Sequence, residues 1–472
     1  MKINNPLGTY KKRKKVYSDL LNKQAGKINK LSNIRLIIAL VGIGNIIYLY
    51  VIKGPSYSYY ISLVYIGLFA YVVTIHNRLK HNNKYFQALH DINETGLHHI
   101  NGKWKEFKDT GLEYLDDSHS FSSDLDVFGQ GSLFQYINTT TSYMGRETLK
   151  RYLTEPCKKE EEIIKRQEAV DELSSQLSWR QRFMAEGLII PDKSDNILNR
   201  KNPYFTPINI ITLWDYQCMI ALESWKKKSG KLIKTWLDTI GEFEALSSLS
   251  NLRYDNPDWT FPKITDKLYN IRARDMGHPL ITENRVCNDL KIDGPTRALL
   301  ITGSNMSGKS TYLRTAGINL VLAYAGGPVC AKEFHCNIFY IYTCMRVSDN
   351  LEKNISSFYA ELLRIKEIVD ESKRSKVFFL LDEIFKGTNS HDRHEGAKIL
   401  IKRLLDNNAI GLISTHDLEL GVLERESSGK VRNYHFKEYY KNREIHFDYK
   451  LNPGISTTRN AMYLIKMVGI ND

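Results

Sequence analysis

Two long runs of apolar residues lie near the start of the chain. Leu36–Ile52 is a run of 17 residues in which Asn45 is the one strongly polar side chain, and Tyr57–Ile75 is a run of 19 residues without a charge. Each run approaches the roughly 20 residues that an α-helix needs to cross the hydrocarbon core of a bilayer. Gly54-Pro55 between them favours a turn. The pattern predicts a hairpin of two transmembrane helices within residues 36–75.

The basic residues beside these runs predict their orientation. The chain has 66 Lys and Arg against 53 Asp and Glu, a net charge of +13. Residues 1–84 hold fourteen of the basic residues and one acid, so the whole excess lies around the two runs and residues 85–472 are neutral overall. Because positive residues stay on the cytoplasmic side, we expect a two-span membrane protein with both termini in the cytoplasm. Net charge is therefore no evidence for DNA binding, although a local basic face remains compatible with it.

Two other interpretations of the apolar runs stay open. A cleaved signal peptide fits poorly, because about 30 residues of charged chain precede the first run and a second run follows it. A helical hairpin buried in a soluble core is the other alternative. The six cysteines form no CxxC pair and no metal-ligand spacing, which indicates scattered reduced thiols.

Amphipathic helices are predicted through the middle of the chain. Apolar residues recur every three or four positions in residues 145–153, 158–184 and 238–252. Residues 208–225 are apolar enough for a third span. However, Asp215 in the middle of this run and the lysines that follow it favour a core or interfacial helix.

A short apolar strand near the middle of the second half leads into a phosphate-binding pattern. Ala298–Thr302 is followed directly by Gly303-x-x-x-x-Gly308-Lys309-Ser310, and a helix-compatible run begins at Thr311. In this strand–loop–helix context, small residues let backbone N–H groups surround phosphates at a helix N-terminus. We expect Lys309 to contact the β- and γ-phosphates of ATP and Ser310 to hold Mg²⁺. The predicted ATP-binding residues are Gly303, Ser304, Asn305, Met306, Ser307, Gly308, Lys309, Ser310 and Thr311.

Two further apolar strands deliver the predicted catalytic groups. The first strand, in residues 376–389, ends in Asp382 and Glu383, at the edge of the sheet where ligands bind in open α/β folds. We expect Asp382 to hold Mg²⁺ and Glu383 to act as the general base that polarises the attacking water. The second strand, in residues 409–420, ends at His416, which is predicted to reach a γ-phosphate. A mixed sheet is expected, with strands 431–440 and 443–451 as an antiparallel pair at its edge.

Together these motifs resemble those of the MutS mismatch-repair ATPases, a branch of the ABC-type ATPases. TGSNMSGKSTYLR is similar to the family's TGPNMxGKSTxxR, LLDEIFKGTNSHD to its DEIGRGTSTxDG, and STHDLEL to its ATHxxEL. Residues 347–365 resemble the family's signature segment, with Ser356 and Ser357 at the place of its Ser-Thr pair. In the family these signature residues reach the nucleotide of the partner subunit. The resemblance begins near residue 130 and continues to about residue 470.

The resemblance implies a domain organisation and a function. An α/β P-loop ATPase domain is expected at 276–472, after an all-α core or lever domain at 127–275 and a linker or helical segment at 76–126. These follow the two transmembrane helices and a basic cytoplasmic segment at 1–35. The family further implies ATP hydrolysis with Mg²⁺, an ATP-dependent homodimer and binding to double-stranded DNA, in mismatch repair or DNA-damage sensing.

Departures from the family pattern leave alternative functions open. No residues match the family's mismatch-reading domain, and Pro156 to Gly277 is too short for full lever helices with a DNA clamp. Phe385 and Asn354 each replace a family glycine in the ATPase motifs. One alternative is therefore a nucleotide-dependent membrane scaffold without a DNA role. Another is an ABC-type transport motor, although the LSGGQ signature is missing and two spans form no conduit.

Overall fold

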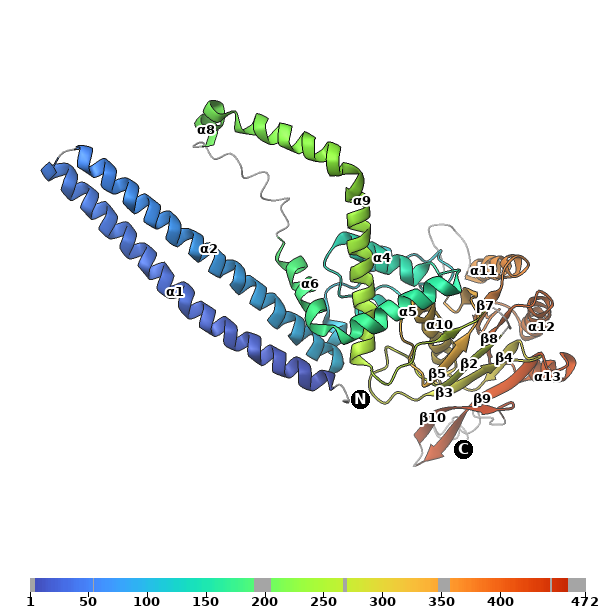
Figure 1. The fold of residues 1–472 in the computed structure, drawn as a ribbon. Helices are drawn as coiled ribbons and strands as arrows, with labels where there is room; N and C mark the ends of the chain where they lie inside the picture. The colour runs from blue at the N-terminus through green and yellow to red at the C-terminus, as the bar shows by residue number, and fades with distance from the viewer. Residues whose placement is uncertain are drawn as a thin grey trace. The chain divides into compact units, whose positions relative to one another are not determined.

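Helices and strands divide the chain into two units, each built from segments that are distant in the sequence. The structure, a computed structural model, describes residues 5–53, 55–190, 205–265, 270–346, 357–441 and 444–456. One unit comprises residues 1–104 and 176–237, and the other comprises residues 105–175 and 238–472. The segments are coloured by residue number in Figure 1. The expected domain limits stay a prediction.

The first unit is built on two long helices. Helix α1 (Pro6–Lys53) lies along α2 (Pro55–Ile100), and α6 (Leu177–Ile189) packs on α2 (Figure 1). The buried core where α2 meets α6 consists of Ala88, Leu89, Ile92 and Ala185. Beside it, the amides of Asn93 and Gln181 exchange hydrogen bonds of 3.2 and 3.0 Å. The residues between 76 and 100, expected to be a linker or helical, thus continue α2.

The two predicted transmembrane runs lie in α1 and α2, and their apolar side chains are exposed. Both helices are long and apolar enough to cross a membrane, and only 6% and 11% of their most apolar windows are buried. The alternative of a hairpin buried in a soluble core therefore does not fit. The polar residue of the first run is satisfied within the hairpin, because Asn45 Nδ2 donates to Tyr65 Oη over 2.8 Å.

The segment predicted as one helix at 208–225 forms two. Helix α8 (Phe205–Thr212) is separated from α9 (Trp214–Asp255) by Leu213, whose φ of 49° interrupts the helix. The predicted helix at 238–252 is the last part of α9 rather than a separate element. Large apolar side chains of α8 and of the first half of α9 are exposed. Of the expected core or interfacial helix at 208–225, the core alternative is therefore wrong, and the interfacial one stays a prediction.

Short helices precede the sheets in the second unit. These are α3 (Leu133–Ile137), α4 (Tyr143–Thr154), α5 (Glu160–Ser175) and the last part of α9. The continuous helix predicted at 158–184 is wrong, because Gln176 leaves helical geometry and separates α5 from α6. Just before it, the hydroxyls of Ser174 and Ser175 donate to the carbonyls of Asp171 and Glu172, each over 2.7 Å. Such bonds compete with the backbone bonds that would continue the helix.

A six-stranded mixed sheet forms the centre of the second unit. Its strands, in spatial order, are β10 (Glu444–Pro453), β9 (Val431–Lys441), β4 (Ala298–Thr302), β8 (Ile410–Thr415), β7 (Val377–Asp382) and β6 (Tyr340–Cys344). Neighbouring strands from β9 to β6 are parallel, and β10 runs antiparallel to β9 at the edge. The predicted mixed sheet with an antiparallel edge pair is confirmed.

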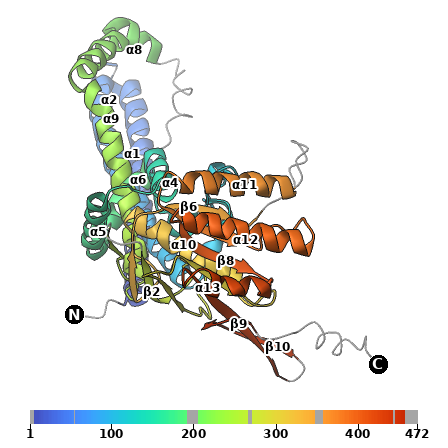
Figure 2. The same ribbon diagram turned by 90° about the vertical axis from the view of Figure 1, so that its right-hand side faces the viewer.

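Helices cover both faces of this sheet. Alternate residues of a strand point to opposite faces, and β7 shows this alternation. Phe379 and Leu381 pack in a core cluster with residues of α11 (Ser357–Ser372) and α12 (Ser390–Asp406), which lie next to each other in Figure 2. Leu380 instead lies against Gly317 of α10 (Lys309–Ala325). Helix α10 is buried along nearly its whole length, so it is the central helix of this unit.

A second sheet of four strands was not predicted. Its order is β1 (Lys263–Ile264), β5 (Glu333–Cys336), β2 (Ile271–Met276) and β3 (Asn288–Ile292). It is joined to the edge of the main sheet through Asn288, which donates from Nδ2 to Tyr449 O over 2.9 Å and accepts from Leu451 N over 2.8 Å. In β2 the alternation of buried and exposed residues extends only over Ile271–Arg274, and the register shifts before Met276.

Candidate functional site

The phosphate-loop pattern forms a tight loop between a buried strand and a buried helix. All five residues of β4 are buried, and α10 begins at Lys309 directly after the loop. Gly303 and Gly308 have φ values of 148° and 105°, which favour glycine. At Gly303 a Cβ atom would lie 2.8 Å from Ser307 Oγ. These two positions therefore need glycine, as the sequence pattern indicates.

Lys309 points its ammonium group into this loop. Its Nζ donates to the carbonyl oxygens of Gly303, over 3.0 Å, and Ser304, over 2.9 Å. The side chain is 4% exposed, and Nζ lies 3.6 Å from Glu383 Oε1. Burial lowers the pKa of Lys309, and the neighbouring carboxylates of Glu383 and Asp382 oppose that shift. The lysine therefore places a positive charge inside the loop, next to two acids.

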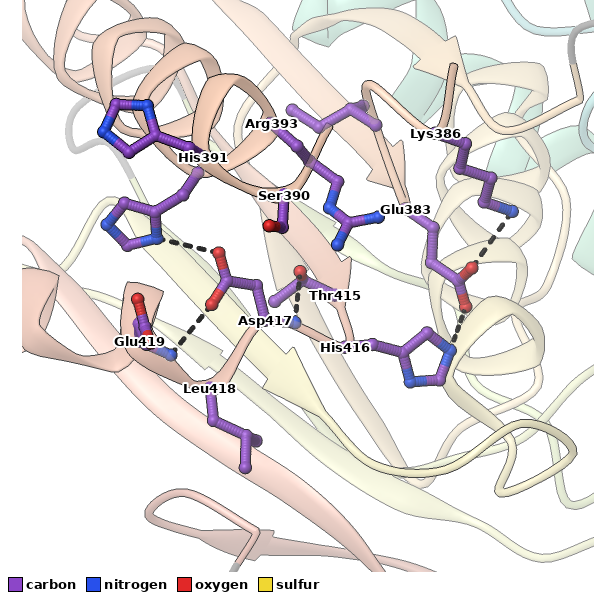
Figure 3. A pocket seen from close by; sticks show the side chains of 12 residues that line it. Glu383, Lys386, Ser390, His391, Arg393, Thr415, His416, Asp417, Leu418 and Glu419 are labelled. Carbon is purple, nitrogen blue, oxygen red and sulfur yellow. Dashed lines mark hydrogen bonds and ion pairs between the residues drawn. The ribbon is translucent and has the colours of Figure 1, made fainter. Parts of the chain in front are cut away.

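The predicted catalytic residues meet at the carboxyl ends of β7 and β8. Asp382 pairs with Ser414 across the two strands, and the Ser414 hydroxyl donates to the Asp382 carboxylate. Beyond the strands, Glu383 Oε1 lies 2.7 Å from His416 Nε2, and Glu383 Oε2 lies 3.0 Å from Lys386 Nζ. Figure 3 shows the Glu383 carboxylate between these two partners. Lys386 was not among the predicted site residues.

These contacts keep Glu383 ionised. The hydrogen bond from His416 is the largest cause that lowers the pKa of Glu383 to about 2, and the bond from Lys386 acts in the same direction. Partial burial of the carboxyl group opposes both. At neutral pH Glu383 is therefore a carboxylate whose two oxygens both accept hydrogen bonds.

Asn305 connects the phosphate loop to His416. Its Oδ1 lies 2.7 Å from His416 Nε2, the nitrogen that also faces Glu383. Lys309 Nζ is farther from that nitrogen, at 3.4 Å. Because two acceptor oxygens are closest to it, we assign a proton to His416 Nε2. Asn305 and Glu383 then share this donor, which ties the loop to the ends of β7 and β8.

A cavity of about 460 Å³ lies against the loop. Its predicted lining residues include Asn305, Met306, Gly308, Lys309, Ser310, Thr311 and Glu383. The volume is in the range of small-molecule sites. The cavity is also lined by residues that the sequence reasoning missed, among them Asn284, Asn288, Phe436 and Tyr449. No local motif marks Asn288, Phe436 and Tyr449, which belong to β3, β9 and β10.

Glu383 borders a second cavity as well. This cavity of about 550 Å³ is lined by residues of α12 and of the segment after β8, among them Lys386, Arg393, His416 and Asp417 (Figure 3). On this side, His394 Nδ1 lies 2.8 Å from Asp417 Oδ2, which connects α12 to the segment after β8. Glu383 thus lines both cavities.

The predicted signature residues are only partly covered by the structure. Ser356 lies outside the described residues, and Ser357 is the first residue of α11, with a side chain that is likewise not described. The rest of α11 is fixed to the turn after β7. Glu361 accepts the backbone N–H of Phe385 over 2.5 Å, and a Cβ atom at Gly387 would lie 2.9 Å from Phe358 Cβ. Helix α11, which includes the second half of the signature segment, therefore contacts the turn that carries Glu383.

The residues of the site fit a nucleoside triphosphate with Mg²⁺. The buried hydroxyl of Ser307 has no hydrogen-bond partner among the described residues, so a donor is available within the loop. Backbone N–H groups at the N-terminus of α10 and the Lys309 ammonium suit phosphate oxygens. The Ser310 hydroxyl and the Asp382 carboxylate are the hard oxygen ligands that Mg²⁺ prefers.

Comparisons with known proteins match two parts of the chain to family models. The family model for MutS domain V matches residues 299–472, and that for MutS domain III matches residues 112–200. Together the two matches cover more than half of the chain.

The curated relatives are named DNA mismatch repair proteins. The DNA mismatch repair protein MutS of Persephonella marina is 32% identical over 238 residues, which are 49% of this chain and 27% of that protein. MutS of Methanosarcina mazei is 28% identical over 265 residues, 54% of this chain and 29% of that protein. The DNA mismatch repair protein MSH3 of Debaryomyces hansenii is 30% identical over 247 residues, 49% of this chain and 24% of that protein. The chain thus aligns with less than a third of each relative, and by its two matched domains it belongs to the MutS family.

Proposed function

We propose that this chain is a membrane-tethered ATPase that binds ATP with Mg²⁺ at residues 303–311, hydrolyses it in a site completed by a second copy, and couples this cycle to DNA binding. The observation that carries the proposal is the meeting of Lys309, Glu383 and His416 at one edge of the sheet, within 3.6 Å of one another. Phosphate binding and activation of water need these groups together.

Each group has a distinct part in the proposed reaction. Lys309 and the backbone N–H groups of the loop would hold the phosphates, while Ser310 and Asp382 would hold Mg²⁺. The metal would supply positive charge for the oxygens of the phosphoryl group that is transferred. Glu383 would orient the attacking water by accepting its hydrogen bond. Its two oxygens accept from His416 and Lys386, and a carboxylate oxygen with one partner keeps a lone pair that can accept from a water.

The proposed composite site rests on the connection between α11 and the turn after β7. Glu361 and Phe358 fix α11 to that turn. Residues 347–356, which precede α11, resemble the signature segment that acts across a dimer. A partner that binds this segment would therefore act on the turn carrying Glu383.

The ATPase and its dimer can be tested with the full chain in detergent or nanodiscs. Glu383→Gln should bind ATP without hydrolysing it and accumulate as an ATP-dependent dimer, measured by light scattering. Lys309→Ala should weaken ATP binding by at least about tenfold, because it removes charge-assisted contacts to phosphate. Lys373→Ala, which changes an exposed lysine just after the end of α11, is the matched control. A chain that hydrolyses ATP at the normal rate as a monomer would contradict the composite site.

DNA binding is supported by the names of the relatives and needs its own test. A gel-shift titration would compare homoduplex, mismatched and branched DNA, with and without ATP, at several salt concentrations. We expect ATP-sensitive binding whose affinity falls as salt rises, since contacts to phosphates release counterions. Absence of binding at low salt would reject the DNA role and favour the membrane scaffold.

A further inference from the structure

An exposed apolar surface covers α8 and the first half of α9. Its large side chains have exposed fractions between 47% and 83%; they are Ile210, Ile211, Leu213, Trp214, Tyr216, Met219, Ile220, Leu222, Trp225, Leu232 and Trp236. Soluble proteins rarely expose so many neighbouring apolar side chains, and such patches mark interaction surfaces. The surface belongs to the first unit and lies outside the two long helices α1 and α2.

Five of the exposed apolar residues and most of the lysines of α9 lie on different sides of the helix. Trp214, Leu222, Trp225, Leu232 and Trp236 follow one another at steps of three, four, seven or eight residues, which places them on one stripe. The same turns carry a cluster of lysines, which are Lys226, Lys227, Lys228, Lys231 and Lys234. Most of these lysines lie on the side of the helix that faces away from the stripe. A tryptophan-rich stripe with lysines beside it is typical of helices that lie in a membrane interface.

The acids next to this surface have local partners. Asp215 accepts a 2.6 Å hydrogen bond from Asn209 Nδ2, and its backbone N–H donates to Asn209 Oδ1 over 2.9 Å. Glu223 lies 3.6 Å from Lys226 Nζ. These contacts join the bend between α8 and α9 and reduce the cost of bringing the two carboxylates close to an apolar phase.

We propose that residues 205–237 bind an anionic lipid surface, lying in the plane of the interface as a membrane contact separate from the hairpin. The five lysines between 226 and 234 have no acid among them, so they complement anionic headgroups. Pairing of this stripe with a second copy would instead bring two such lysine clusters together. The lysines also make a third membrane crossing unfavourable. Tryptophan side chains prefer the interface, where their rings are buried and their N–H groups reach water.

Tryptophan fluorescence of the full chain tests this contact directly. Three of the six tryptophans lie on the stripe, and none lies in α1 or α2, so the emission does not report on the hairpin. We expect quenching in vesicles of phosphatidylcholine and phosphatidylglycerol whose acyl chains carry bromine. The quenching should disappear when Trp214, Trp225 and Trp236 are replaced by Phe. It should persist with Trp179→Phe, which changes an exposed tryptophan of α6.

Two further measurements distinguish binding to anionic lipid from pairing of the stripe with a second copy. Replacing the five lysines by Gln should lower the quenching in anionic vesicles to the level seen in pure phosphatidylcholine. Equal quenching in both vesicle types would overturn the anionic part of the proposal. Cys218 is exposed on the same stripe, so a disulfide between two Cys218 residues without quenching would show that a second copy covers the stripe.

The proposal of a membrane hairpin and the proposal of an α9 contact can be tested independently. Flotation of the chain with vesicles reports membrane attachment as a whole, and the Trp→Phe comparison reports α9. A chain that floats but shows no quenching retains the hairpin proposal and overturns this one. A chain that does not float overturns both.

Discussion

At the scale of single residues, the turn that carries Glu383 has a strained backbone. Glu383 and Phe385 have φ values of 50° and 61°, in the left-handed region that favours glycine. The family pattern places a glycine where this chain has Phe385, and the positive φ explains that preference. Here the burial of Phe385 and the hydrogen bond from its N–H to Glu361 hold the conformation without a glycine. The substitution therefore leaves the turn beside the phosphate loop intact.

The buried carboxyl group of Glu361 should make the folding stability of the chain depend on pH. Burial is the largest cause that raises the pKa of this carboxyl group above its usual 4.5. Its contribution is therefore most favourable below pH 4.5 and is lost as pH rises through the raised value in the folded state. Glu361→Gln keeps an acceptor for the Phe385 N–H without a charge. We expect its melting temperature to fall less than that of the wild type between acidic and neutral pH.

Two other variants complete this test. Glu361→Ala leaves the Phe385 N–H unpaired and should cost about 1–3 kcal/mol of folding free energy at acidic pH, where the wild-type carboxyl group is neutral. Glu367→Gln changes a half-exposed glutamate of the same helix and should leave the pH dependence unchanged. If Glu361→Gln keeps the wild-type slope of melting temperature against pH, burial of Glu361 has no effect on stability.

At the scale of elements, the order of the strands brings the site together. Strands β4, β8 and β7 are neighbours in the sheet although they are far apart in the sequence. Because they are parallel, their carboxyl ends deliver the loop, His416 and the Asp382-Glu383 pair to the same edge. Helix α10 must then pack closely on the sheet so that its N-terminus stays at that edge.

A matched pair of glycine substitutions measures this packing. At Gly317 of α10 a Cβ atom would lie 2.7 Å from Leu125 Cδ2 and 2.8 Å from Leu380 Cδ1. We expect Gly317→Ala to destabilise the second unit by about 1–3 kcal/mol through overpacking. At Gly396 of α12 the nearest atom is 3.4 Å away, in ordinary contact. Gly396→Ala should therefore stabilise by about 0.5–1 kcal/mol through helix propensity.

Urea denaturation followed by circular dichroism would measure both changes. The two variants should shift the unfolding midpoint in opposite directions. A neutral Gly317→Ala would show that α10 can move away from the sheet without cost.

At the scale of the whole molecule, the chain combines two domains of the MutS family with two long apolar helices. The proposed topology places residues 53–56 outside the membrane and the basic segment inside. In cells that express a Cys218→Ser background, a maleimide that cannot cross membranes should label Ser56→Cys directly. It should label Lys12→Cys only after the membrane is made permeable. Equal labelling of both positions in intact cells would contradict the two-span arrangement.

Local patterns were sufficient to place the glycine-rich loop between a strand and a helix and the acids and histidine at two strand ends. The glycine spacing after an apolar strand identified residues 303–311, and the acids and histidine after two further strands identified their neighbours. Patterns failed where a helix breaks without a proline or glycine. Such a break at Gln176 separates α5 from α6, and residues on either side belong to different units. Patterns also failed at residues 208–225, where a core helix was one of the expected alternatives and the apolar side chains are exposed.

The sequence by itself determined the two apolar runs, the chemistry of the loop and the family, because these depend on residue types at fixed local spacing. Only the tertiary structure decided that Glu383 is held by His416 and Lys386, and that Tyr449 forms a wall of the cavity. It also decided that the stripe of α9 is exposed rather than buried. The physical reason is that burial and long-range contacts depend on which elements pack together. Asn288 and Tyr449, 161 residues apart, come into contact only after both sheets have formed.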